Sequence, residues 1–143
     1  MNTYIRFFVL FLLIMTLPRL ANAAMPVEII QTTGDTVGQR LVYYVKEGIR
    51  ASNSMTLAFD EKTPRMQVEI VTIDQNPANP GYSTAYSFVV LWENPNQPFP
   101  FYLNQYVGYC GANRVRACAD DLVANISQNS DEIIKLLINA SKN

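Results

Sequence analysis

The 143-residue sequence contains no histidine. Histidine is the commonest general base in enzymes, so its absence excludes both the Ser-His-Asp and the Cys-His catalytic arrangements. The chain also lacks the Gly-x-Ser-x-Gly, Ser-x-x-Lys and phosphate-loop motifs that mark other active sites. These absences predict a protein that is not an enzyme.

Pairs of acidic residues remain as candidates for catalysis, and they occur at residues 60–61 and 120–121. A glycosidase needs two carboxyl groups that face each other across a cleft. Adjacent acids in a turn or on a helix more often belong to a solvated surface. A cell-wall or sugar-acting enzyme that uses carboxylates alone is therefore kept only as a second alternative.

Cysteine is scarce, and basic clusters are absent. The two cysteines, Cys110 and Cys118, make a poor metal site without histidine, so we expect no metal and no other cofactor. Lysine and arginine number 11 against 12 acidic residues, and they form no basic run. This balance argues against nucleic acid as a partner and against electrostatic binding to membranes.

The first residues carry a pattern typical of export. A short start with one positive charge precedes an apolar run at residues 7–17, and residues 21–23 (Ala-Asn-Ala) fit the pattern that signal peptidase reads. The run is eleven residues long, and spanning a bilayer takes about 20. We therefore predict a cleaved signal peptide at residues 1–23 and a single α+β domain at residues 24–143. The predicted location is periplasmic or secreted, with no stable membrane anchor after cleavage.

The predicted export determines the expected oxidation state of the two cysteines. In an oxidising compartment an even number of cysteines most simply forms disulfides, so Cys110 and Cys118 are predicted to be bonded to each other. A redox-active pair is the weaker alternative, because the spacing is not C-x-x-C and no histidine is present to tune a thiolate.

Residues 82–93 show the most regular pattern in the chain. Aromatic and β-branched residues alternate there with smaller ones, which predicts a half-buried strand, and its length predicts a central one. Other strands are predicted at residues 27–31, 55–59, 66–74 and 101–107. Consecutive strands joined in this way most simply form an antiparallel meander.

Helical patterns lie on both sides of these strands. A helix is predicted to begin near Thr36, where Thr36 and Gln39 fit a capping box, and apolar residues then recur every four positions. Residues 114–127 form a second amphipathic segment, and Ser130 can cap a further helix; one helix with a kink near Asn129 is equally open. The predicted fold class is α+β: an antiparallel meander of four to five strands, with an N-terminal amphipathic helix and a C-terminal helix or helices packed on one face.

One candidate contact surface is the segment at residues 106–118, which is unusual in composition. A rigid recognition loop held by the disulfide would use Tyr106, Tyr109, Arg114 and Arg116 as contact residues. The alternative is a strand-to-helix connection that the disulfide stabilises without any role in binding.

The second candidate surface is the more polar face of the sheet, where Val71, Ile73 and Ala85 add apolar side chains. If residues 66–74 and 82–93 form a hairpin, we expect Ile73 near Ser83 and Val71 near Ala85. Large apolar patches are seldom left bare on soluble monomers. The C-terminal helix (through Ile134, Leu137 and Ile138), a second copy of the chain, or a partner could cover this patch.

The function predicted from these patterns is that of an exported, non-enzymatic binding or accessory protein. It would act through protein–protein contacts, with a partner in the cell envelope or as a homo-oligomer. An inhibitor or immunity protein against a cell-wall hydrolase or toxin is the alternative, since it would present the rigid segment at residues 106–118.

Overall fold

The structure is a computed structural model that describes residues 24–60, 62–140 and residue 142. The predicted signal peptide at residues 1–23 lies outside the described residues. None of the helices among the described residues is long and apolar enough to cross a membrane.

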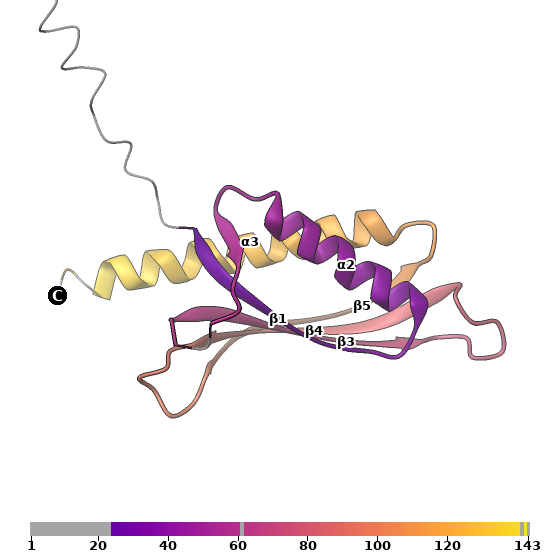
Figure 1. The fold of residues 1–143 in the computed structure, drawn as a ribbon, viewed down its shortest axis with the longest axis horizontal. Coiled ribbons are helices and arrows are strands. Elements are labelled where there is room, and N and C mark those ends of the chain that lie inside the picture. Colours follow the sequence, from indigo (N-terminus) through magenta and orange to yellow (C-terminus); the bar gives the residue numbers. More distant parts are fainter. Residues whose placement is uncertain (1–23, 61, 141, 143) are drawn as a thin grey trace, which may run out of the picture.

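The described part of the chain folds into one five-stranded sheet with two helices on one side of it (Figure 1). The elements, in chain order, are β1 (Met25–Thr33), α2 (Thr36–Arg50), β2 (Met55–Leu57), β3 (Arg65–Asp74), β4 (Ser83–Glu93), β5 (Phe101–Gly111) and α3 (Val115–Ala140). The strands lie in the order β2-β1-β3-β4-β5. The predicted α+β class is confirmed.

The prediction of an all-antiparallel meander is wrong, because the sheet is mixed. Only β3, β4 and β5 pair antiparallel, while β1 lies between β2 and β3 and pairs parallel with both. The reason is the crossover: α2 returns the chain to the end of the sheet where β1 began, so the next strand must run in the same direction as β1. After β2 the Ala58 N–H donates to the Val27 carbonyl at 2.8 Å, and the chain passes from there to β3 on the other side of β1.

Helix α2 begins where the sequence places it, but its cap is one residue earlier than predicted. Asp35, not Thr36, is the N-cap: its carboxylate accepts a hydrogen bond from the Gly38 N–H at 2.7 Å. The same carboxylate accepts from the Thr84 hydroxyl at 2.8 Å. The cap therefore fixes the start of α2 against β4 as well as satisfying the helix terminus.

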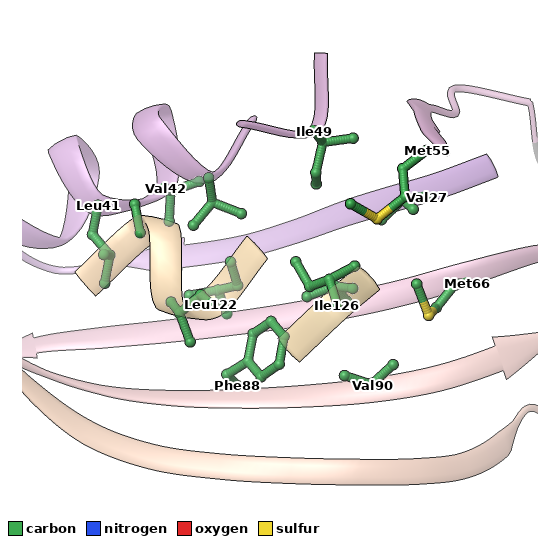
Figure 2. Close-up of a cluster of buried hydrophobic side chains, with 14 of the residues drawn as sticks. Val27, Leu41, Val42, Ile49, Met55, Met66, Phe88, Val90, Leu122 and Ile126 are labelled. Atoms are coloured by element: carbon green, nitrogen blue, oxygen red, sulfur yellow. The ribbon is translucent and has the colours of Figure 1, made fainter. Parts of the chain in front are cut away.

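The hydrophobic core lies between the helices and the sheet. Figure 2 shows Phe88 and Val90 of β4 pointing toward Leu122 and Ile126 of α3. Leu41 and Val45 of α2 are fully buried in the same cluster, as expected for residues that face the aromatic side of β4. The alternation in β4 thus directs one set of its side chains to both helices.

Helix α3 is a single helix, not two. Ser130 lies inside it and is fully buried, so the prediction that Ser130 caps a separate last helix is wrong. Asn129 is also buried, and its side-chain amide donates to the Asn125 carbonyl at 2.7 Å. The apolar face from Val115 to Ile133 passes this polar pair without a break, although the buried Ser130 hydroxyl has no hydrogen-bond partner among the described residues.

Candidate functional site

One face of the sheet carries no other element among the residues that the structure describes. Helices α2 and α3 both pack on the opposite face (Figure 1). We call the uncovered face the open face; its side chains come from alternate residues of β1, β3, β4 and β5. Because no helix covers it, the open face is the largest part of the sheet that is available to a partner.

One end of the open face holds the charged side chains, which are paired with one another, next to Leu91 of β4 and Tyr102 of β5. The Arg65 guanidinium is 3% exposed and binds two carboxylates, Glu28 of β1 at 2.6 Å and Glu93 of β4 at 3.2 Å. Beside it, the Gln67 side-chain amide donates to the Glu69 carboxylate at 2.9 Å. Gln67 and Glu69 lie on this face as predicted, yet Gln67 is buried among its neighbours. The three glutamates exceed the single arginine, so this end carries excess negative charge.

The other end of the open face is apolar. Ile73, Ala85 and Tyr109 lie side by side in one row across β3, β4 and β5. The next row holds Val71 and Val107 on either side of a serine of β4. The exposed fractions are 50% for Val71, 65% for Ile73, 70% for Tyr109 and 77% for Val107. Small residues on β4 between larger ones on its neighbours make this apolar end shallow.

The register between β3 and β4 differs from the prediction by two residues. Ile73 pairs with Ala85 rather than lying near Ser83, and Val71 pairs with Ser87 rather than with Ala85. The loop after β3 explains the shift. The Asp74 carboxylate accepts hydrogen bonds from the backbone N–H groups of residues 76 and 81, at 2.8 and 3.0 Å, and so closes the loop on the end of the strand.

The C-terminal helix does not cover this patch. Helix α3 lies beside α2 on the opposite face, and Leu137 and Ile138 near its end remain 47% and 48% exposed. Of the three covers considered from the sequence, a second copy and a partner remain.

The segment at residues 106–118 is not a loop. Strand β5 continues to Gly111 and α3 begins at Val115, so only residues 112–114 connect them. The disulfide between Cys110 and Cys118 joins the end of the strand to the first turns of the helix, with a Cα–Cα distance of 6.2 Å. The segment is therefore a stabilised strand-to-helix connection rather than a loop, and its role in binding stays a prediction.

The four predicted contact residues of this segment do not come together. Tyr106 points to the core side, where its ring centroid lies 5.5 Å from that of Phe88, while Tyr109 lies on the open face. Arg114 is in the turn, and Arg116 lies over the ring of Tyr44 at 5.4 Å. Only Tyr109 joins the apolar end that Val71, Ile73 and Ala85 form. Val107, the most exposed residue of this end, was missed, because the strand was expected to stop there.

A separate groove of about 380 Å³ lies between α2 and α3. Its lining includes Tyr43, Tyr44, Glu47, Arg116 and Asp120. The aromatic residues were not singled out from the sequence, although Tyr43 lies off the apolar stripe of α2 and is 57% exposed. In this groove Arg116 lies near two acidic residues and two tyrosines. Such a cluster is as typical of packing between two helices as of a ligand site.

The described members of the two acidic pairs lie in a turn and on a helix. Asp60 accepts a hydrogen bond from the Lys62 N–H at 2.9 Å in a turn, and Asp120 lines the groove between the helices. Glu61 lies outside the described residues. Within the described part of the chain, no group of three or more candidate ligands could hold a metal ion. Burial, with a smaller contribution from the Asp121 carboxylate, raises the pKa of Tyr86 above its usual value.

Comparison with known proteins adds no assignment to this geometry. No family model matches the sequence, and no curated protein matches it at a level that indicates a relationship.

Proposed function

We propose that this protein is exported and acts without catalysis, by binding another protein through the apolar end of the open face. The observation that carries the proposal is the row of Ile73, Ala85 and Tyr109 with Val71 and Val107 beside it, on a face that α2 and α3 leave uncovered. Contiguous exposed apolar side chains on a folded domain are typical of interaction sites.

Two features support export. The disulfide between Cys110 and Cys118 indicates an oxidising compartment outside the cytoplasm. The pattern of residues 1–23 fits a signal peptide, which leads to a periplasmic or secreted location.

The chemistry of the open face suggests what kind of partner fits it. Beyond the apolar end, Glu28, Glu69 and Glu93 outnumber Arg65. A complementary segment would place apolar side chains over β3 to β5 and a lysine or arginine over the acidic end. Charge complementarity of this kind fixes the orientation of a partner more than it adds affinity.

The alternative of an inhibitor or immunity protein has less support. It depended on an exposed loop that the disulfide holds rigid, whereas that segment is the end of β5 and the start of α3. A face of a sheet, not a protruding loop, is the surface that this chain offers.

The substitution Val71→Lys tests the proposal. Val71 is 50% exposed, so the ammonium group reaches water and the fold should persist, with a melting temperature close to that of the wild type. The matched control is Leu136→Lys on α3, at a side chain that is 63% exposed and far from the open face.

The readout is crosslinking in the envelope fraction, followed by quantitative mass spectrometry of the proteins that each variant recovers. We expect at least one protein to be lost with Val71→Lys and retained with Leu136→Lys. The same set of proteins recovered with wild type and both variants would reject the open face as the binding surface.

A further inference from the structure

Strand β5 forms one edge of the sheet, and among the described residues no strand pairs with its outer side. The strand is eleven residues long and contains neither a charged residue nor a proline. Native proteins usually protect edge strands with lysine, proline or a very short length, because unpaired backbone groups bind other strands. The opposite edge, β2, has only three residues. The unprotected edge is therefore β5.

The hydrogen bonding between β4 and β5 shows which backbone groups are free to pair outward. The Ala112 N–H donates to the Tyr82 carbonyl at 2.8 Å, which makes these residues a hydrogen-bonded pair. Such pairs alternate along an antiparallel ladder. Tyr86 and Gly108 form another pair two steps further on, so the backbone groups of the residues between the paired ones point away from β4. Val107 is one of these.

The outward-facing residues of β5 are Gln105, Val107 and Tyr109. The Gln105 N–H is occupied by the side chain of Asn104, at 2.9 Å. The backbone N–H and carbonyl groups of Val107 and Tyr109 have no partner among the described residues. Their side chains lie on the open face and are 77% and 70% exposed. This part of the edge is therefore accessible from outside the sheet.

We propose that a second copy of this chain pairs antiparallel with β5, with Val107 of one copy opposite Val107 of the other. A two-fold axis through this pair places Gln105 opposite Tyr109 on both sides of it. There the Tyr109 N–H donates to the Gln105 carbonyl of the other copy, while the Gln105 N–H keeps its bond to the Asn104 side chain. Since paired residues of an antiparallel ladder point to the same side, the two open faces become continuous and all four helices lie on the other side.

The sequence of β5 is suited to itself in this register. On the helix side, Gly108 of one copy lies opposite Tyr106 of the other, and the Tyr86 ring that covers Gly108 brings a second aromatic residue to this pair. On the open face, valine meets valine across the axis. No charge in the strand opposes its copy. Without residues 1–23, which hold two arginines and no acid, the chain has 9 basic and 12 acidic residues, a net charge of −3.

A two-fold contact also explains why the edge can stay unprotected. The contact pairs the β5 edge of both copies, and only the short β2 strands remain as edges of the combined sheet. The assembly therefore stops at a dimer. The pairing uses the backbone of β5 and leaves the side chains of the proposed binding surface, including those of Val107 and Tyr109, on the open face. Val71 lies on β3, outside the pairing, so its substitution probes the proposed function alone.

Two charge variants at one position test the register. Val107→Lys and Val107→Asp each place like charges on the axis, so each should raise the dissociation constant of the dimer roughly tenfold or more. A mixture of the two should recover dimers, because lysine then faces aspartate. Val107→Thr keeps an uncharged β-branched residue and should remain dimeric. The protein is produced in full from an exporting host, and mass is measured by sedimentation equilibrium.

A third variant tests the pairing itself. Val107→Pro removes an N–H group that points away from β4, a position that an edge strand tolerates. It should be a folded monomer, with the melting curve that the wild type shows at concentrations low enough to dissociate its dimer. The pairing is confirmed when Val107→Lys and Val107→Asp are folded monomers that dimerise on mixing.

Two results would overturn the dimer. One is a wild-type protein that sediments as a monomer at about 100 µM, which would also be the outcome if the edge accepts only a strand of another protein. The other is a dimer that Val107→Lys and Val107→Asp leave intact while Val71→Lys dissociates it, since that dimer would use the open face. If Val71→Lys remains a dimer but no longer crosslinks to a protein that the wild type recovers, the dimer interface and the proposed binding surface are distinct.

Discussion

The ring of Tyr86 lies directly across Gly108 of the neighbouring strand. The two residues pair in the β4–β5 ladder, and a β-carbon at residue 108 would come within 2.5 Å of the Tyr86 hydroxyl oxygen. Glycine weakens a strand because it has no side chain to pack. The tyrosine ring fills the space over Gly108 and so restores packing in an edge strand.

Gly108→Ala should therefore destabilise the protein by about 1–3 kcal/mol, since the added methyl group forces the Tyr86 ring or the strand to move. Urea denaturation followed by circular dichroism measures the loss. Gly34→Ala is the control, because a β-carbon there would be in ordinary contact, 3.4 Å from the nearest atom, and the change should stay within about 0.5 kcal/mol. Equal effects of the two substitutions would show that the ring does not pack on Gly108.

Leu41→Ala should cost about 2–5 kcal/mol, because Leu41 is fully buried between α2 and the sheet. Gln39→Ala on the same helix should have a small effect, since Gln39 is exposed and the cap of α2 is made by Asp35. Thermal and urea denaturation of both variants provide the comparison. Small and similar losses would mean that α2 is not docked on the core as described.

The disulfide should leave no free thiol in the mature protein. Titration of the non-reduced protein in denaturant should give close to zero thiols per chain, and two per chain would contradict the bond between Cys110 and Cys118. The double substitution of both cysteines by alanine should lower stability by about 2.5 kcal/mol in the loop-entropy description, because the closed loop is short.

Alkaline pH should destabilise the wild type more than Tyr86→Phe. The pKa of Tyr86 is raised in the folded protein, chiefly by burial and then by the Asp121 carboxylate, so above about pH 10 the unfolded chain loses this proton while the folded chain keeps it. Stability is unaffected by this group below pH 10 and falls as the pH rises through the folded pKa. Urea midpoints at pH 8 and pH 11 should show a smaller drop for Tyr86→Phe, whereas identical drops would refute the shift.

Local patterns in the sequence were sufficient for much of the fold. The alternation of β4 and the four-residue spacing of α2 depend on which side of an element faces the core, and that information is local. The disulfide also follows from the cysteine count together with the predicted export. The order of the strands depends on information that is not local. Strand β1 pairs parallel with β3 because α2 reverses the chain, and the residues of β1 do not indicate which strands lie beside it.

The candidate site was predicted in part, for a related reason. Val71, Ile73 and Ala85 were found because apolar residues appeared on a face expected to be polar. Val107 was missed, because the glycine that follows it suggested that the strand ended there. Gly108 is tolerated in the strand because Tyr86, from another strand, covers it. Only the pairing of the two strands makes this visible.

The interior position of β1 has a consequence for how the chain is made. Although β1 comes first in the chain, Val27 takes its neighbours from Leu57 on one side and Met66 on the other. A chain that emerges from its N-terminus must therefore hold an unpaired, largely apolar strand until β3 has followed it. Exposed strands of this kind aggregate, and chaperones bind them. The interval between the emergence of Met25 and that of Asp74 is accordingly the stage at which nascent chains depend most on a chaperone.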